Sequence, residues 1–178
     1  MSTDSTAVIE VPQGVEVIVG KDHVHIKGPK GDLKRTFPQK SIEIKVDAGK
    51  VTVAPRDKSS STRALVGTFN SHIKNMITGA QTPFVYKLKI AYTHFPVTVS
   101  VSGSDFSVAN FLGEKKPRKA SLPKGVKVSI QGDKITIESP DIESAGKAAT
   151  LIEQTTRISK RDRRVFQDGI FIVEKGKQ

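Results

Sequence analysis

The sequence predicts an α+β protein with two tandem duplicated domains, each a small antiparallel β-sheet packed against one α-helix. Residues 12–29 superimpose without a gap on residues 123–140, which indicates an internal repeat, although chance similarity between two hairpins is the alternative. Strand-like alternation of apolar and polar residues outweighs helical periodicity. The length of 178 residues suits two small domains and excludes a large multidomain enzyme.

Strands are expected in the first half at residues 15–19, 24–26, 33–37, 42–46 and 51–54. The first two form a hairpin because the alternation breaks at residues 20–22. A helix follows, N-capped within residues 59–61 and ended by Gly79. Its apolar positions recur at three- and four-residue spacing, at Leu65, Phe69, Ile73 and Met76.

The second half repeats this organisation. Strands are expected at residues 84–90, 97–101 and 106–112, before the second copy of the hairpin. Asp141 caps a helix that runs to about Ile158, with an apolar stripe of Ile142, Ala145, Ala148, Ala149 and Ile152. Asp168-Gly169 then makes a turn or bulge into one closing strand, rather than the two-residue turn of a hairpin. Residues 81–83 are the best linker, so we expect domains at 1–81 and 82–178.

The composition points to a polyanionic partner. Twenty-nine Lys and Arg against 18 Asp and Glu give a net charge of +11 and a pI near 9.9, which favours nucleic acid over an anionic membrane. The absence of cysteine excludes disulfides and Cys-ligated metals and fits a reducing compartment. No segment approaches the roughly 20 apolar residues of a membrane span, and residues 1–6 do not resemble a signal peptide. We expect a soluble cytoplasmic protein.

Nothing in the sequence favours an enzyme, a metal site or a cofactor. His23 and His25 share a strand face, but no third ligand is nearby. The zinc-hydrolase and serine-acylase motifs are absent, and residues 102–105 are a hairpin turn rather than a nucleophile loop. Residues 28–31 lack phosphate-loop spacing and are a turn between strands, or a turn whose Lys30 and backbone amides touch an RNA phosphate.

The positive charge is organised in two clusters. Residues 1–81 hold 12 basic and 8 acidic residues, and residues 82–178 hold 17 and 10, so the second half is the more basic. The first cluster comprises Lys115, Lys116, Arg118, Lys119, Lys124 and Lys127. The second comprises Arg157, Lys160, Arg161, Arg163 and Arg164, diluted by Asp162.

Basic side chains on loops suit folded RNA, because they can follow an irregular phosphate surface and Arg can bind phosphate in bidentate fashion. DNA is disfavoured because neither helix has the face of a recognition helix. The eight Phe and two Tyr mostly sit in alternating apolar patterns, which disfavours a base-stacking platform. The competing classes are a basic adaptor that binds an acidic protein and, remotely, a hydrolase with an unrecognised site.

Several motifs resemble large-subunit ribosomal protein six, in its archaeal and eukaryotic-type branch. They are His94-Phe95-Pro96, residues 110–115, Asp141-Ile142-Glu143 leading to residues 152–156, and the ending with Asp162, Arg164, Phe166, Asp168-Gly169-Ile170 and residues 173–176. Residues 12–15, 28–31 and 63–65 also fit. The resemblance covers essentially the whole chain. The short segments before and after the matching residues favour the archaeal type.

The resemblance implies two similar domains and a structural role on large-subunit rRNA, near the base of the lateral stalk and the sarcin–ricin region. It also implies neighbouring large-subunit proteins, nearby translational GTPases and no catalysis by the chain itself. The second domain would be the main rRNA-contacting part. From charge we expect these rRNA-binding residues: Lys30, Arg63, Lys115, Lys116, Arg118, Lys119, Arg157, Lys160, Arg161, Arg163, Arg164 and Lys175.

Overall fold

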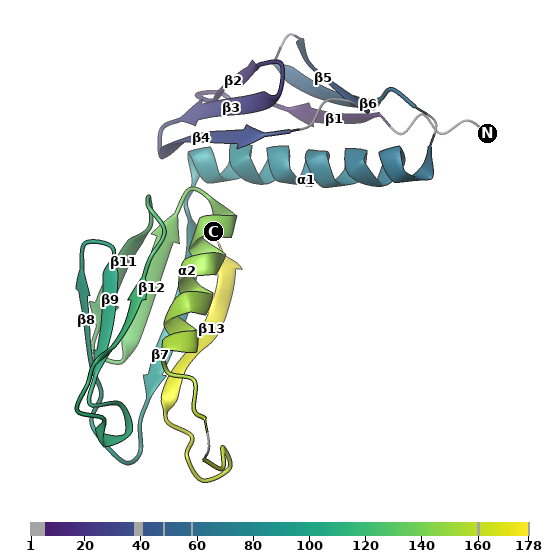
Figure 1. Ribbon diagram of the computed structural model, residues 1–178. Helices are drawn as coiled ribbons and strands as arrows, with labels where there is room; N and C mark the ends of the chain where they lie inside the picture. The colour runs from purple at the N-terminus through teal and green to yellow at the C-terminus, as the bar shows by residue number, and fades with distance from the viewer. Residues whose placement is uncertain (1–5, 38–40, 48, 58, 160, 178) are drawn as a thin grey trace. The chain divides into compact units, whose positions relative to one another are not determined.

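The computed structural model describes residues 6–37, 41–47, 49–57, 59–159 and 161–177. The chain divides into two compact units, Met1–Pro83 and Phe84–Gln178. Each unit has its own hydrophobic core, six antiparallel strands and then one α-helix, and the second unit adds a closing strand (Figure 1). The α+β class and the tandem duplication predicted from the sequence are confirmed.

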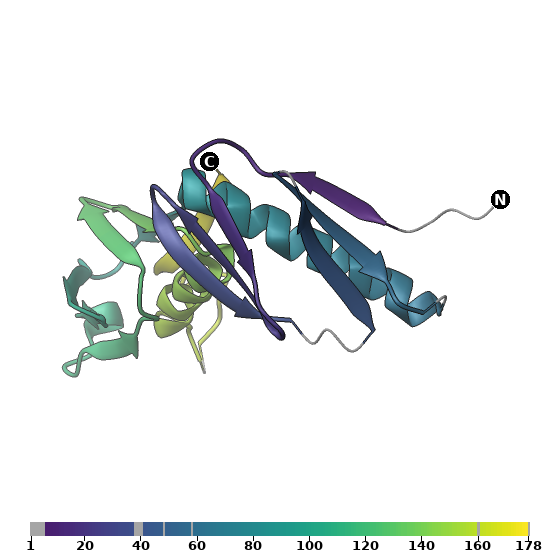
Figure 2. The same cartoon turned by 90° about the horizontal axis from the view of Figure 1, so that it is seen from above.

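The first unit places two three-stranded sheets on one long helix. Its elements are β1 (Ala7–Glu10), β2 (Glu16–Val19), β3 (His23–Gly28), β4 (Gly31–Thr36), β5 (Ile42–Asp47), β6 (Lys50–Pro55) and α1 (Ser60–Gln81). The sheet orders are β1-β6-β5 and β2-β3-β4. Figure 2 shows both sheets lying along α1.

The second unit packs a four-stranded and a three-stranded sheet with its helix. Its elements are β7 (Phe84–Ala91), β8 (Thr98–Ser102), β9 (Asp105–Ala109), the 3₁₀ turn η1 (Phe111–Gly113), β10 (Arg118–Ser121), β11 (Lys127–Gln131), β12 (Lys134–Ser139), α2 (Ile142–Thr155) and β13 (Gly169–Lys177). The sheet orders are β11-β12-β7-β13 and β10-β9-β8. Two sheets per unit were not expected from the sequence.

The helices differ from the prediction at particular residues. Leu65 is 42% exposed, and Val66 takes its place in the core. Gly79 does not end α1, which continues to Gln81 with Gly79 buried. The N-cap prediction for α2 is confirmed, because the Asp141 carboxylate accepts the amides of Glu143 at 3.2 Å and Ser144 at 3.1 Å.

The apolar stripe of α2 is buried as predicted at Ala145, Ala148, Ala149 and Ile152. The helix ends at Thr155, short of the expected end near Ile158. Residues 106–112 are not one strand either. β9 ends at Ala109, since Asn110 and Leu112 have positive φ angles of 58° and 53°, which no strand accommodates.

The two units share a topology, but their equivalence is not the one predicted. Sheet β1-β6-β5 corresponds to β7-β12-β11, and β2-β3-β4 corresponds to β8-β9-β10. The hairpin β5–β6 is therefore the counterpart of β11–β12, and Lys50–Pro55 matches Lys134–Ser139. The similarity between residues 12–29 and 123–140 pairs β2–β3 with β11–β12 instead. This sequence similarity reflects the alternation of apolar and polar residues that any half-buried hairpin has.

Residues 28–31 form the turn between β3 and β4, as both interpretations expected. The Lys30 amide donates to the Ala80 carbonyl at 3.0 Å, so this amide is occupied at the end of α1. Gly28 makes the close approach possible, because a Cβ at this position would lie 2.6 Å from the Ala80 oxygen and 2.8 Å from the Ala80 Cβ.

We expect Gly28→Ala to lower the free energy of unfolding by about 1–3 kcal/mol, because the end of α1 has to move. The matched control is Gly67→Ala on α1, where an added Cβ meets nothing within 4 Å. It should raise the free energy of unfolding by about 0.5–1 kcal/mol through helix propensity. Urea denaturation of the full chain measures both. Equal effects of the two substitutions would contradict the contact between the turn and the helix end.

Candidate RNA-binding surface

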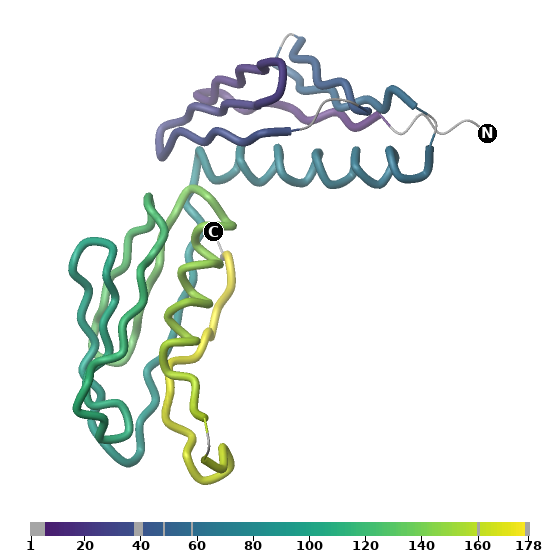
Figure 3. Tube along the Cα trace, in the orientation of Figure 1, coloured from purple at the N-terminus to yellow at the C-terminus, as the bar shows by residue number. Residues whose placement is uncertain are grey.

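Three loops meet at one end of the second unit. Residues 92–97 join β7 to β8, residues 110–117 join β9 to β10, and residues 156–168 join α2 to β13. Figure 3 shows the three loops at the same end, which is termed the loop end. The last two loops carry most residues of the two basic clusters.

The Arg118 guanidinium fastens two of these loops together. Its Nε and Nη2 donate to the Glu114 carboxylate at 2.8 and 2.5 Å, and its Nη1 donates to the carbonyls of Thr155 and Arg157, each at 3.0 Å. The guanidinium also lies 4.6 Å from the centre of the Phe111 ring. All three guanidinium nitrogens therefore donate hydrogen bonds within the chain. Arg118 positions the loops, and its guanidinium is not free to bind a phosphate in bidentate fashion.

The electrostatics of Glu114 show that the two clusters are neighbours. The hydrogen bond from Arg118 lowers the pKa of the Glu114 carboxyl below its ordinary value. Burial opposes this shift, and the charges of Arg118 and Arg161 lower the pKa further. Arg161 belongs to the loop 156–168, so its charge reaches the loop 110–117.

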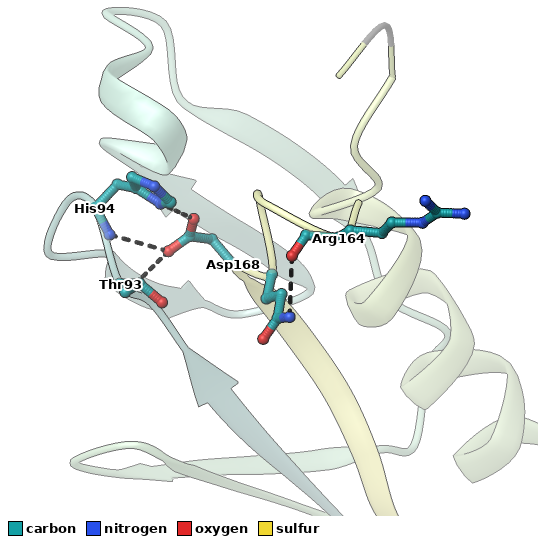
Figure 4. A network of polar contacts seen from close by, with 5 residues as sticks. Thr93, His94, Arg164 and Asp168 are labelled. Carbon is teal, nitrogen blue, oxygen red and sulfur yellow. Dashed lines mark hydrogen bonds and ion pairs between the residues drawn. The ribbon is translucent and has the colours of Figure 1, made fainter. Parts of the chain in front are cut away.

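Asp168 anchors the third loop, at the point where β13 begins (Figure 4). Its side chain is 1% exposed and accepts the backbone amides of Thr93 and His94, the latter at 3.3 Å. The His94 Nδ1 donates to Oδ2 at 2.7 Å. Burial alone raises the pKa of Asp168, but these donors outweigh burial and hold the pKa below its ordinary value. The ionised carboxylate thus joins residues 93–94 to the start of β13.

Stacked side chains extend this anchor toward the arginines. The rings of His94 and Phe166 are stacked with centres 5.0 Å apart, and the Arg161 guanidinium lies 4.7 Å from the centre of the Phe166 ring. Asp162 shapes the part of this loop that joins Arg161 to Phe166. Its carboxylate accepts the Arg164 amide at 2.9 Å, and its carbonyl accepts the Phe166 amide at 2.9 Å. Asp162, which the sequence presented as a dilution of the cluster, organises a turn.

The structure brings most of the predicted rRNA-binding residues together. Exposed at the loop end are Lys115, Lys116, Lys119, Arg157, Arg161, Arg163 and Arg164. Lys160 lies outside the described residues. Arg118 is half-buried between the loops, as described above. The remaining three are elsewhere: Lys30 in the β3–β4 turn, Arg63 in the first turn of α1, and Lys175 on β13, about 20 Å along the strand from Gly169.

The sequence analysis missed aromatic side chains at this end. Tyr92 and Phe95 are exposed, and the Phe95 ring lies over Gly113, where an added Cβ would be 3.5 Å from it. The side-chain amide of Asn110 donates to the Pro96 carbonyl at 3.0 Å, which ties the two loops. The signal available in the sequence was that Tyr92 and Phe95 flank His94 at a strand end, outside the alternating pattern.

Among the described residues, no group of three His, Cys, Asp or Glu side chains is arranged to hold a metal ion. In the same part of the chain, neither helix is both long and apolar enough to cross a membrane.

The low pKa of Asp168 predicts a pH-dependent contribution to stability. The carboxylate stabilises the folded unit fully above the ordinary Asp pKa of about 3.9, and this contribution is lost as the pH falls through the lower folded pKa. We expect Asp168→Asn to lower the free energy of unfolding by about 1–3 kcal/mol at pH 7. The difference from the natural chain should shrink below about pH 4.

Urea unfolding at several pH values measures this difference. The control is Asp105→Asn at an exposed strand end, which should change stability little. A difference for Asp168→Asn that stays constant from pH 7 to pH 3 would contradict the role of the ionised carboxylate.

Comparison with known proteins accounts for this architecture. The family model described as ribosomal protein L6 matches residues 11–82 and again residues 95–169. The two matches begin at residues 11 and 95, 84 residues apart, the offset that also places Lys50–Pro55 on Lys134–Ser139. The duplication seen in the strand order is thus found independently in the family model.

Archaeal relatives match nearly the whole chain. Large ribosomal subunit protein uL6 of Methanocella arvoryzae is 46% identical over 176 residues, covering 98% of this chain and 99% of that protein. The protein of the same name from Methanosarcina mazei is 44% identical over 167 residues, 94% of this chain and 95% of its own length. That from Ignicoccus hospitalis is 46% identical over 171 residues, with 93% and 92% covered. This chain belongs to the ribosomal protein L6 family.

Proposed function

We propose that this chain is a structural, non-enzymatic component of the large ribosomal subunit in the cytoplasm, and that it binds large-subunit rRNA through its loop end. The observation that carries the proposal is the bridge from Arg118 to the Thr155 and Arg157 carbonyls, which gathers the lysines of one loop and the arginines of another on one surface. Family membership and the names of the relatives support the ribosomal setting.

The surface suits folded RNA for physical reasons. Lysines and arginines that neutralise phosphates release condensed counterions, which makes binding strong and dependent on salt. Most of the side chains project from loops held by Arg118, Asp162 and Asp168, and Lys119 projects from the start of β10, so the array does not depend on a regular helix. An irregular RNA surface is read by such an array through its shape.

The location of the binding site on the large subunit is part of the same proposal. We place the binding site near the base of the lateral stalk and the sarcin–ricin region, beside other large-subunit proteins and close to where translational GTPases act. The family resemblance supports this placement. We assign the main contact to the domain 82–178, because it holds 17 basic and 10 acidic residues and contains the whole loop end.

Nuclease footprinting of large-subunit rRNA with the full chain tests the proposal. It is done at two salt concentrations and with transfer RNA as competitor. We expect protection confined to the rRNA around the sarcin–ricin region, surviving the competitor. Diffuse protection that the competitor removes would overturn the proposed site and favour a basic adaptor that binds an acidic protein.

The salt dependence of binding identifies the surface. Changing Lys115, Lys116 and Lys119 together to Gln should flatten the slope of log affinity against log salt by about 2–3 units, since each lysine replaces about one counterion. The matched control changes Lys21, Lys34 and Lys74, three exposed lysines of the first unit, to Gln. It should leave the slope unchanged. Filter binding to the rRNA measures both, and equal slopes for the two triple variants would remove this loop from the interface.

A further inference from the structure

A hollow of about 780 Å³ opens beside the basic loops, between the end of α2, the loop 156–168 and the start of β13. It lies wholly within the second unit. Its volume is in the range of small-molecule sites, about 300–1,000 Å³, which is ample for one nucleotide.

One wall of the hollow is apolar and partly aromatic. Ile158, Phe166 and Phe171 line it, and Phe171 is 42% exposed. Gly169 lets the Phe171 ring lie back along the strand, because a Cβ at Gly169 would be 3.0 Å from the end of that ring. An exposed ring held in this way is a flat surface against which a planar group can pack.

Cationic groups face the same hollow. Arg157 and Arg163 line it with exposed side chains, and neither guanidinium has a hydrogen bond or ion pair within the part of the chain that the structure describes. Two acidic residues also line it, but both are engaged. Glu153 accepts the Ile172 amide at 3.2 Å, and Asp168 accepts Thr93 and His94. The two arginines are therefore the cationic groups in the lining that can donate hydrogen bonds to a ligand.

The geometry points to a site for one unstacked RNA nucleotide, and this inference rests on the proposed function. The base packs against Phe171 and Ile158, and its phosphate lies between Arg157 and Arg163. Sequence-tolerant stacking of splayed-out bases on aromatic rings, with arginine on the phosphate, is a general mode of RNA recognition. The loop end would thus combine phosphate contacts with the capture of one base, which the sequence analysis disfavoured.

Nuclear magnetic resonance of the isotopically labelled full chain tests this site with 5′-AMP and 5′-UMP as probes. We expect amide shifts at residues 156–158 and 167–171, with an affinity at least about fivefold higher than that of ribose 5-phosphate, which lacks the base. Equal affinities for the nucleotides and ribose 5-phosphate would overturn the base site and leave a phosphate contact only.

Single substitutions separate the two halves of the site. Phe171→Leu should abolish the preference for nucleotides over ribose 5-phosphate, and Arg163→Gln should weaken both ligands about equally. The matched control is Arg56→Gln, an exposed arginine of the first unit, which should change neither affinity. Retention of the nucleotide preference in Phe171→Leu would contradict the stacking role.

Filter binding of the same variants to large-subunit rRNA distinguishes this inference from the proposed function. With the site present, Phe171→Leu should weaken rRNA binding about fivefold or more while leaving the salt slope unchanged. Normal rRNA binding by the natural chain, without nucleotide shifts in the hollow, would reject the site and leave the proposed function standing. If the natural chain does not bind the rRNA and shows no nucleotide-dependent shifts in the hollow, both the nucleotide site and the proposed function are rejected.

Discussion

The forked contacts of Arg118 are the interaction on which the loop end depends. The guanidinium joins the Glu114 carboxylate to the carbonyls of Thr155 and Arg157, so it caps the end of α2 while it fixes the loop 110–117. Lysine cannot replace it, since one ammonium lacks the planar fork that reaches both sides. The sequence analysis expected Arg118 to bind phosphate, and the structure shows it bringing the other basic residues of the two loops together.

Gathering like charges at one end opposes folding, and the structure offsets this repulsion with three acidic residues at the bases of the loops. Glu114 holds Arg118, Asp162 holds the Arg164 amide, and buried Asp168 holds Thr93 and His94. Each carboxylate accepts a donor within the loop end, and Glu114 forms an ion pair with the Arg118 guanidinium. The negative charges of these three residues reduce the repulsion among the basic side chains, while the more numerous exposed lysines and arginines keep the surface cationic.

The sequence predicted the features that depend on residues close together in the chain. Alternation located the hairpins, and apolar residues at three- and four-residue spacing located both helices. Asp141 identified a cap because capping depends on the next three residues. The sequence did not predict β1 and β10, since Ala7–Glu10 and Arg118–Ser121 lack the apolar–polar alternation that marked the equally short β2. Nor did it predict which basic residues are free. Arg118 and Lys119 are adjacent and similar in charge, and only the distant carbonyls of Thr155 and Arg157 distinguish them.

The closing strand explains why the basic surface belongs to one half of a duplicated chain. After six strands and a helix, the first unit leads directly into β7, whereas the second continues through residues 156–168 into β13, which pairs with β7. Two outward amides of this edge strand are satisfied by side chains at the C-terminal end of α2. Thr156 Oγ1 accepts the Ile170 amide at 2.9 Å, and Glu153 accepts the Ile172 amide at 3.2 Å. These bonds block further strand addition there, so the sheet ends at β13, and this added strand holds the arginine-rich loop in place.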